Sequence, residues 1–425
     1  PRPPAPAPEV DTDAAGMTLD LTISTAPGQT AVAPGERRRT WTEDGRPHAR
    51  FVTSTPVTPV FGVASARYAR HAVRHGHVTV EVYAHPDHGG NVPQMLHAAT
   101  VSLDVLGAAW GPYPHATLRI AEVPAGWPFG AFAFPGFVAF TEDRGFLTDP
   151  RDADRLDLVS RRVAHEVAHQ WWGHTARARG GPGDVFIVET MAKYGEQKVI
   201  RALHGDAQVA RLVAYDRDRY ARGRAEAGGP EVPLAGVTDQ SHLYYGKGAV
   251  VMNGLRGLLG ERALDAALAT LMRTDRRVSP DDWRTAVLAA APPEARPLVD
   301  DWTRRVVLYD LTVERATAAP RADGRFDVTV RLLASRTEAG RPLPLDEALD
   351  LGLYADDPAE GAEPVAIHTV RAHAGAVVAR IVADRRPAFV AIDPLVRRVD
   401  VDPEGQVAAV EAAPGASDPS RSSEE

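Results

Sequence analysis

The sequence His165-Glu166-Val167-Ala168-His169 constrains this chain more than any other feature. Residues four apart lie on the same face of a helix, so His165 and His169 can present their imidazoles to one ion while Glu166 lies beside it. Neutral His nitrogens bind zinc, and a catalytic zinc site keeps one position open for water. A carboxylate next to zinc-bound water can accept its proton as the water attacks a carbonyl carbon. The motif is therefore typical of a metallopeptidase.

The residues around the motif predict a helix from Asp154 to Gly173. Apolar side chains recur every four residues and would form one buried stripe. They are Val159, Val163, Val167 and Trp171. Gly173 is a typical helix end. Because a motif this short also arises by chance, the zinc site needs a third ligand to support it.

Glu189 is the candidate for that third ligand. A Gly- and Pro-rich loop, residues 178–184, separates it from the motif, and a helix beginning near Asp184 would carry Glu189 in its first two turns. The neighbouring residues are apolar, so an acidic side chain here needs a compensating charge. A solvated face or a buried ion pair is the alternative to a ligand. Glu196, about two turns further on, is predicted to be a surface residue or a hydrogen-bond partner of a ligand.

The two segments together resemble a known family. H-E-V-A-H-Q-W-W-G at residues 165–173, followed by V-E-T-M-A-K-Y at residues 188–194, resembles the gluzincin aminopeptidases, the membrane alanyl aminopeptidase-like zinc peptidases. The spacing to Glu189 is one residue longer than is usual in that family. This spacing and the E-T-M-A-K-Y context are similar to a bacterial branch in which the peptidase is fused to the permease of an ABC-type transporter.

The resemblance implies one Zn²⁺ per chain, held by His165, His169 and Glu189, with Glu166 as the general base. It implies a peptide substrate, a location on the extracytoplasmic face of a bacterial membrane, and a membrane permease segment outside this chain. The start on Pro1-Arg2-Pro3-Pro4 favours a portion of a longer protein.

A third match is S-H-L-Y-Y-G-K-G at residues 241–248, which resembles the Y-x-K-G segment of that branch. The resemblance implies that Tyr245 donates a hydrogen bond to the oxyanion of the tetrahedral intermediate, as acyl-transfer chemistry requires. Read from the sequence alone, Tyr245 would more often be an aromatic side chain packed beside the start of a helix.

The segment Gly130–Glu142 occupies the place of the family's G-A-M-E-N motif, whose Glu holds the free amine of the substrate. Gly130 and Ala131 are retained and are implied to contact substrate. Ala133 and Phe134 stand where the Glu and Asn would be. This difference weakens the aminopeptidase assignment but not the hydrolytic one. Glu122 or Glu142 could replace the amine anchor, with an ordinary structural role as the alternative.

Composition and charge argue against several kinds of site and partner. The chain has 425 residues and no Cys, so thiolate ligands and disulfides are excluded. No apolar run approaches the ~18 residues needed to span a bilayer. The net charge of −8, with both signs mixed, argues against a nucleic-acid partner.

Hydrophobic periodicity predicts an α+β multidomain fold. The resemblance implies a thermolysin-like, mainly helical catalytic domain, flanked by a remnant of the family's N-terminal β-sandwich and by a small C-terminal β-sandwich. The predicted boundaries are 1–16 for a disordered linker, 17–85 for the truncated N-terminal β-domain, 86–305 for the catalytic domain, 306–402 for the C-terminal β-domain and 403–425 for a disordered tail.

The sequence therefore predicts a zinc-dependent, aminopeptidase-like metallopeptidase. The alternative from another class is a catalytically weak or inactive, zinc-containing extracytoplasmic domain of an ABC-type transporter that binds peptides or a partner. The missing amine anchor leaves a third possibility, an endopeptidase.

Overall fold

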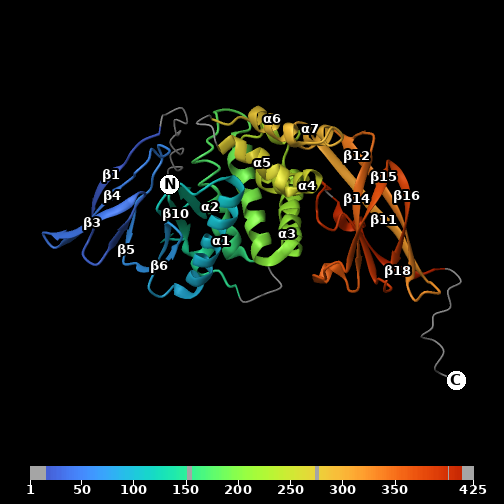
Figure 1. Cartoon of the computed structure of the whole chain (residues 1–425), viewed down its shortest axis with the longest axis horizontal. Coiled ribbons are helices and arrows are strands. Elements are labelled where there is room, and N and C mark those ends of the chain that lie inside the picture. Colours follow the sequence, from blue (N-terminus) through green and yellow to red (C-terminus); the bar gives the residue numbers. More distant parts are fainter. Residues whose placement is uncertain (1–15, 151–155, 273–276, 401, 414–425) are drawn as a thin grey trace, which may run out of the picture. The chain divides into compact units, whose positions relative to one another are not determined.

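The computed structural model describes residues 16–150, 156–272, 277–400 and 402–413 (Figure 1). They fall into two compact units, and each is described by itself. The first comprises the chain up to Gly205 together with Ala235–Gln240 and Leu259–Arg296. The second comprises Asp206–Leu234, Ser241–Leu258 and the described chain from Pro297.

The first unit begins with short antiparallel strands. One sheet has the order β1-β4-β3, and β2 pairs with β5. The bounds are Asp20–Ser24 for β1, Thr30–Val32 for β2, Glu36–Glu43 for β3, Arg46–Val52 for β4 and Ala64–Ala66 for β5. Phe51 is buried with Ala31, Ala33 and Ala49 in a small core between them.

The first unit also contains a five-stranded sheet with the strand order β6-β7-β8-β10-β9. Its strands are β6 (Ala69–His75), β7 (Val78–Ala84), β8 (Thr117–Val123), β9 (Ala131–Phe134) and β10 (Phe137–Thr141). The three central strands β7, β8 and β10 run parallel, so their carboxyl ends meet at one edge of the sheet. The sheet includes strands on both sides of residue 85, which differs from the domain boundary predicted there.

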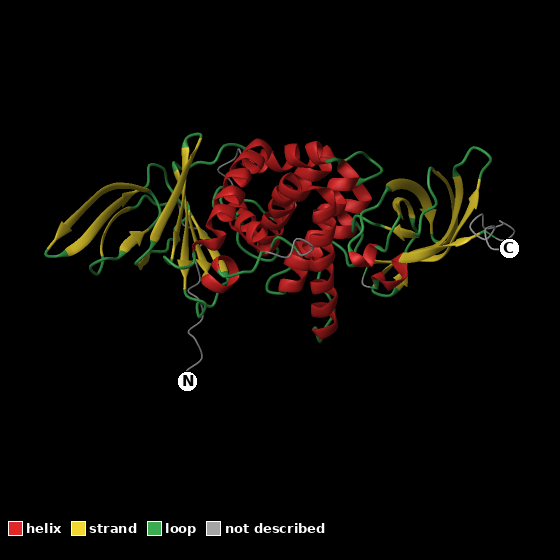
Figure 2. Cartoon of the chain, turned by 90° about the horizontal axis from the view of Figure 1, so that it is seen from below, coloured by secondary structure: helices red, strands yellow, loops and turns green. Residues whose placement is uncertain are grey.

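The helices of the first unit are α1 (Val92–Trp110), α2 (Leu158–Ala168), α5 (Glu261–Met272), α6 (Pro280–Ala290) and the beginning of α3 (Met191–Glu226). Figure 2 draws the helices of both units in red, and in the first unit α1 contacts β6 and β7 while α2 contacts β9. Gly205 has φ 85° inside α3 and kinks it where the two units divide.

The helix that carries the His-Glu motif is shorter than predicted. Asp157 caps α2, because its carboxylate accepts the backbone N–H of Ser160 at 2.8 Å. Ala168 is the last helical residue, and Gly173 has φ 120° beyond the helix end. The predicted end at Gly173 is therefore wrong, and the predicted start at Asp154 lies outside the described residues. Val159, Val163 and Val167 are buried as predicted.

The second unit combines helical segments with a large sheet. The helices are the later part of α3, α4 (Gly248–Leu259) and α7 (Arg296–Thr303). The sheet has the order β13-β12-β11-β18-β17-β14-β15, and β16 pairs with β12. Its bounds are Val307–Pro320 (β11), Phe326–Glu338 (β12), Arg341–Pro342 (β13), Asp346–Tyr354 (β14), Ala366–His373 (β15), Gly375–Ala383 (β16), Phe389–Ile392 (β17) and Val407–Ala412 (β18).

β18 differs from the sequence prediction. It lies in the segment predicted to be a disordered tail, yet it pairs with β11 in parallel and with β17 antiparallel. These pairings join all the C-terminal strands into one hydrogen-bonded sheet. The C-terminal strands follow the predicted change to a period of two, and the small sandwich stays a prediction.

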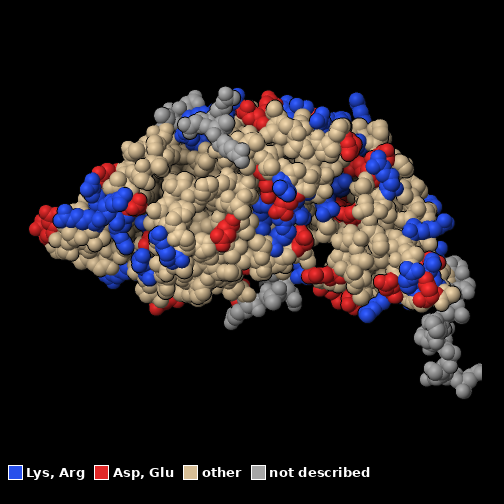
Figure 3. All heavy atoms as spheres, in the orientation of Figure 1, with Lys and Arg blue, Asp and Glu red and all other residues tan. Residues whose placement is uncertain are grey.

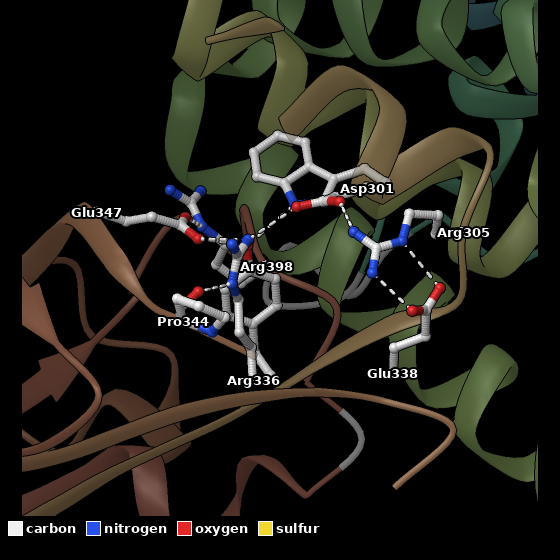
Figure 4. A network of polar contacts seen from close by, with 9 residues as sticks. Asp301, Arg305, Arg336, Glu338, Pro344, Glu347 and Arg398 are labelled. Atoms are coloured by element: carbon white, nitrogen blue, oxygen red, sulfur yellow. Dashed lines mark hydrogen bonds and ion pairs between the residues drawn. The ribbon is translucent and has the colours of Figure 1, made fainter. Parts of the chain in front are cut away.

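An ion-pair network, buried except at Arg305 and Glu338, lies between α7 and the sheet of this unit (Figure 4). Arg336 contacts Asp301 and Glu347, each at 3.1 Å, and Arg398 contacts Glu347 at 3.0 Å. Arg305 bridges Asp301 and Glu338. Because each buried charge has an opposite partner, the network avoids the large penalty of an isolated buried charge.

Surface charge is mixed rather than segregated. On the face drawn in Figure 3, acidic and basic side chains are interspersed. Among the helices in the described ranges, none combines the length and apolar composition that crossing a bilayer requires.

Candidate metal centre

His165, His169 and Glu189 converge in the first unit. One carboxylate oxygen of Glu189, Oε2, lies 3.3 Å from Nε2 of His165 and 3.5 Å from Nε2 of His169. One donor atom from each of the three lies within 4.8 Å of the other two. The structure therefore brings together the three residues predicted to hold zinc.

The chain between His169 and Glu189 reverses direction, so that Glu189 returns to the two His side chains. Gly183 has φ 86°, and a Cβ atom at this position would clash with the backbone carbonyl of Ala235. Its N–H bonds the carbonyl of Val237 at 2.9 Å. The helical turn Phe186–Thr190, with π-type hydrogen bonding, then places Glu189 just before α3. The predicted helix near Asp184 is confirmed.

The outward-facing nitrogen of each His has its own partner. Nδ1 of His165 lies 3.3 Å from Oε2 of Glu196, and Nδ1 of His169 lies 3.0 Å from the carbonyl of Trp172. A metal-bound His usually has its second ring nitrogen held by a carboxylate or a carbonyl, which fixes the ring and its tautomer. Both rings therefore present Nε2 to the common point, as a metal site requires.

Glu196 is buried, with 1% of its side chain exposed, so the surface alternative is wrong. Its Oε1 accepts hydrogen bonds from Arg161 and Lys193, each at 2.7 Å. Burial opposes the charge of Glu196, but Arg161 and Lys193 lower its pKa far below the ordinary value. It is therefore a fixed carboxylate beside His165.

The electrostatics of the three converging residues fit a cation. Burial opposes the charge of Glu189, yet His169 and His165 hold its pKa well below the ordinary range. Burial favours neutral His165, but hydrogen bonds with Glu189 and Glu196 raise its pKa to about 9. Positive charge is therefore stabilised between the three donor atoms. A proton supplies that charge in the absence of metal, and a divalent cation would supply it when bound. The residues present fit a bound zinc ion.

Glu166 lies beside the two His residues and is 8% exposed. Burial raises its pKa above the ordinary value, partly offset by His165 and His169. A raised pKa strengthens a carboxylate as a proton acceptor.

Gln170 and His174 link the end of α2 to edge strand β9, and no motif in the sequence predicts either role. Gln170 accepts the N–H of Gly136 at 2.8 Å and donates to the carbonyl of Phe134 at 3.0 Å. Nε2 of His174 lies 3.0 Å from the carbonyl of Ala133. Burial lowers the pKa of His174 to about 3, so its ring is neutral at physiological pH and can donate only one N–H.

The remaining predicted residues lie elsewhere. Gly130 and Ala131 lead into β9, and the carbonyl of Gly130 accepts the N–H of Thr141 at 3.0 Å. Glu122 lies in β8, where its carboxylate is bonded to the ring of His88 and to the N–H of His85. Tyr245 lies in the second unit.

Tyr245 belongs to the helical segment His242–Lys247, which also has π-type hydrogen bonding. The guanidinium of Arg219 lies 4.7 Å from the centre of its ring. Lys247, at the end of the segment, is fully buried and bonds Glu231 at 2.6 Å. These contacts fix the segment locally.

The comparisons with known proteins agree with this geometry. Residues 107–286 match the peptidase family M1 domain. This M1 segment includes His165, His169, Glu189 and Tyr245.

Curated relatives point to the same family. Human endoplasmic reticulum aminopeptidase 2 is 27% identical over 205 residues, which are 46% of this chain and 21% of the relative. Human endoplasmic reticulum aminopeptidase 1 is 24% identical over 204 residues, 46% of this chain and 22% of the relative. The matched region is thus about a fifth of the length of these relatives. Together the matches support the gluzincin aminopeptidase family and a peptidase hydrolase of the metallopeptidase type.

Proposed function

We propose that this chain holds one zinc ion through His165, His169 and Glu189 and hydrolyses peptide bonds. The observation that carries the proposal is the convergence of the three donor atoms, with both outward His nitrogens held by Glu196 and by the carbonyl of Trp172. A site built in this way is already organised for a metal.

Bound zinc supplies Lewis acidity and lowers the pKa of a coordinated water. Glu166 accepts the proton of the attacking water and passes it to the leaving amine. Its burial suits this task, because burial raises the pKa of Glu166 and a carboxylate with a raised pKa accepts a proton more readily.

Tyr245 is proposed to donate its phenolic hydrogen to the oxyanion. The support is its place in the Y-x-K-G sequence and inside the M1 segment. A hydrogen bond of this kind contributes about 10²–10³-fold in kcat where it has been removed in other enzymes.

The substrate end of the site favours a second candidate, endopeptidase activity. Ala133 has no carboxylate to pair with an ammonium group. Glu122 does not replace it, because both of its oxygens are engaged, at 2.5 Å with His88 and at 2.6 Å with the N–H of His85. A peptide without a free amine would therefore lose no ion pair at this position.

The proposal also includes the protein of which this chain would be a part and its location. The spacing between His169 and Glu189 and the E-T-M-A-K-Y context support a peptidase domain fused to the permease of an ABC-type transporter, on the extracytoplasmic face of the membrane. The alternative is a zinc-containing domain of such a transporter that binds peptides without cleaving them.

One experiment distinguishes an aminopeptidase, an endopeptidase and a binding domain without catalytic activity. Zinc content is measured for the purified chain and for Glu166→Gln, and both are assayed with fluorogenic peptides that carry free or acetylated N-termini. We expect one zinc at the catalytic site in both proteins and a loss of at least about 10³-fold in kcat in Glu166→Gln. Zinc without turnover in the unaltered chain would support the binding domain instead. Cleavage of the acetylated peptides would support an endopeptidase.

A further inference from the structure

A second group of metal-ligating side chains lies in the first unit. It consists of His88, Glu122 and Glu142, and one donor atom from each lies within 4.8 Å of the other two. These residues take no part in the proposed peptidase chemistry.

The sheet topology explains why they meet. His88 follows β7, Glu122 is next to last in β8, and Glu142 directly follows β10. Because these three strands are parallel neighbours, their carboxyl ends lie at one edge. Ligands commonly bind at the carboxyl ends of parallel strands.

Backbone groups hold both carboxylates in place. Oε2 of Glu122 accepts the N–H of His85 at 2.6 Å, and Oε1 of Glu142 accepts the N–H of Ala125 at 3.1 Å. These bonds leave Oε1 of Glu122 directed at the ring of His88. The carboxylates are therefore oriented before any ligand arrives.

Asn91 anchors the two loops that bring the group together. Its amide donates to the carbonyls of Gly145, Phe146 and Thr148, at 2.8, 3.2 and 2.7 Å. These carbonyls belong to or follow the helical turn that begins at Glu142, while Asn91 lies three residues after His88. The buried amide therefore fixes the separation of the His and Glu ligands.

The charge of the group is unbalanced. Two carboxylates face one imidazole, and Glu122 is only 6% exposed while His88 is 21% exposed. Within the described ranges, neither carboxylate has an Arg or Lys partner within 4 Å. The hydrogen bond with Glu122 raises the pKa of His88, so a proton is held at this point. A divalent cation would neutralise the excess negative charge more completely than that proton.

We propose that His88, Glu122 and Glu142 form a second divalent-cation site, distinct from the catalytic one and suited to Zn²⁺. One imidazole nitrogen and two carboxylate oxygens are ligand types that zinc accepts, at about 2.0–2.2 Å, with a fourth position for water. An ion here would tie together the loops after β7, β8 and β10, which include the connection from β8 to Gly130.

Zinc binding to metal-stripped protein tests the proposal. The stripped chain is titrated with Zn²⁺ alone in a calorimeter, and the bound equivalents are counted. We expect two equivalents in the unaltered chain and one in His88→Ala. Glu142→Gln, in which the half-buried carboxylate becomes a neutral amide of the same shape, should weaken the second equivalent at least about 10-fold. Circular dichroism checks that each variant is folded.

Asp87→Asn is the matched control, because Asp87 adjoins His88 but its side chain is 87% exposed and outside the group. It should retain two equivalents. His165→Ala separates the two sites and should retain the one equivalent held by His88. A single equivalent that is lost in His165→Ala and kept in His88→Ala would overturn this inference while leaving the peptidase proposal standing. A single equivalent lost only in His88→Ala would support the second site and contradict the peptidase proposal.

Discussion

The Oε2 atom of Glu196 lies 3.3 Å from Nδ1 of His165, on the side of the ring opposite Glu189. This contact fixes which nitrogen of His165 is available at the candidate metal site. The carboxylate is itself fixed by Arg161 and Lys193, so His165 is oriented by a chain of buried charges.

Replacing Glu196 with Gln should therefore weaken zinc binding. The amide keeps the shape but removes the charge that orients His165 and makes its ring more basic. We expect the zinc affinity to fall about 10–100-fold, measured by competition with a chelator of known affinity. Glu226→Gln, an exposed charge change on α3, is the control and should leave the affinity unchanged. Equal affinities for the two variants would show that Glu196 does not position His165.

Ala133 gives a prediction about substrate choice. Ala133→Glu returns a carboxylate to the position where the resemblance places the amine anchor. We expect the ratio of kcat/KM for free over acetylated N-termini to rise at least about 10-fold, because a buried ammonium–carboxylate pair contributes on the order of 1–3 kcal/mol. Ala133→Gln is the matched control, since it adds similar volume without charge. A similar rise in the Gln variant would show that volume rather than charge changes the preference.

Much of the scaffold could be predicted because local signals were strong. The helix α1 begins at Val92, with Pro93 in its first turn, and ends just before Gly111, which has φ 107°. Pro at a helix start and Gly just after a helix end are both signals that the sequence shows directly. The convergence of His165, His169 and Glu189, the candidate zinc ligands, could be predicted for a similar reason. The spacing of four residues places the two His side chains on one face of a helix. The Gly-rich loop before Asp184 lets the next helix return to them, and Glu189 is the acidic residue in its first two turns.

Other features depend on contacts between distant residues. The end of α2 was misplaced because Gln170 bonds Phe134 and Gly136 on the edge hairpin instead of continuing the helix. β18 was missed because Val407–Ala412 is a short strand whose place is set by pairing with β11 and β17.

The group formed by His88, Glu122 and Glu142 has no motif at all. Its members are brought together only by the parallel order of β7, β8 and β10. A single sequence shows the three residue types but not which strands are neighbours.

Gly183 provides a stability prediction near the metal centre. Gly183→Ala would strain a residue at φ 86° and drive its Cβ into the carbonyl of Ala235. We expect a loss of about 2–4 kcal/mol in the free energy of unfolding, together with weaker zinc binding through displaced Glu189. Gly181→Ala is the control, because Gly181 has φ 118° but no atom within 4 Å of a Cβ. It should cost only about 1–2 kcal/mol, the strain of the backbone alone. Equal losses would show that the close approach to Ala235 is not important.

Asp400 gives a pH dependence for the second unit. Its carboxylate accepts N–H groups of Leu311 and Asp402 and the amide of Gln406, each at 3.0 Å, yet burial raises its pKa from 3.8 to about 6. The folded state therefore binds this proton more tightly than the unfolded chain. The stabilising contribution of protonated Asp400 is complete below pH 3.8 and is lost as the pH rises through 6.

The comparison of unaltered protein with Asp400→Asn isolates this effect. The difference in unfolding free energy, unaltered minus variant, should fall by about 2–3 kcal/mol between pH 4 and pH 7, because each unit of pKa shift corresponds to about 1.4 kcal/mol. Urea unfolding at several pH values measures it, with the slope on denaturant checked for constancy. The Asn side chain has one acceptor oxygen fewer than Asp, so part of the difference in unfolding free energy is expected to be the same at every pH. Only the part of the difference that changes with pH reports the titration of the Asp400 carboxylate. A difference that stays constant from pH 4 to pH 7 would mean that Asp400 titrates alike in the folded and unfolded chain, and that its three hydrogen bonds fully offset the cost of its burial.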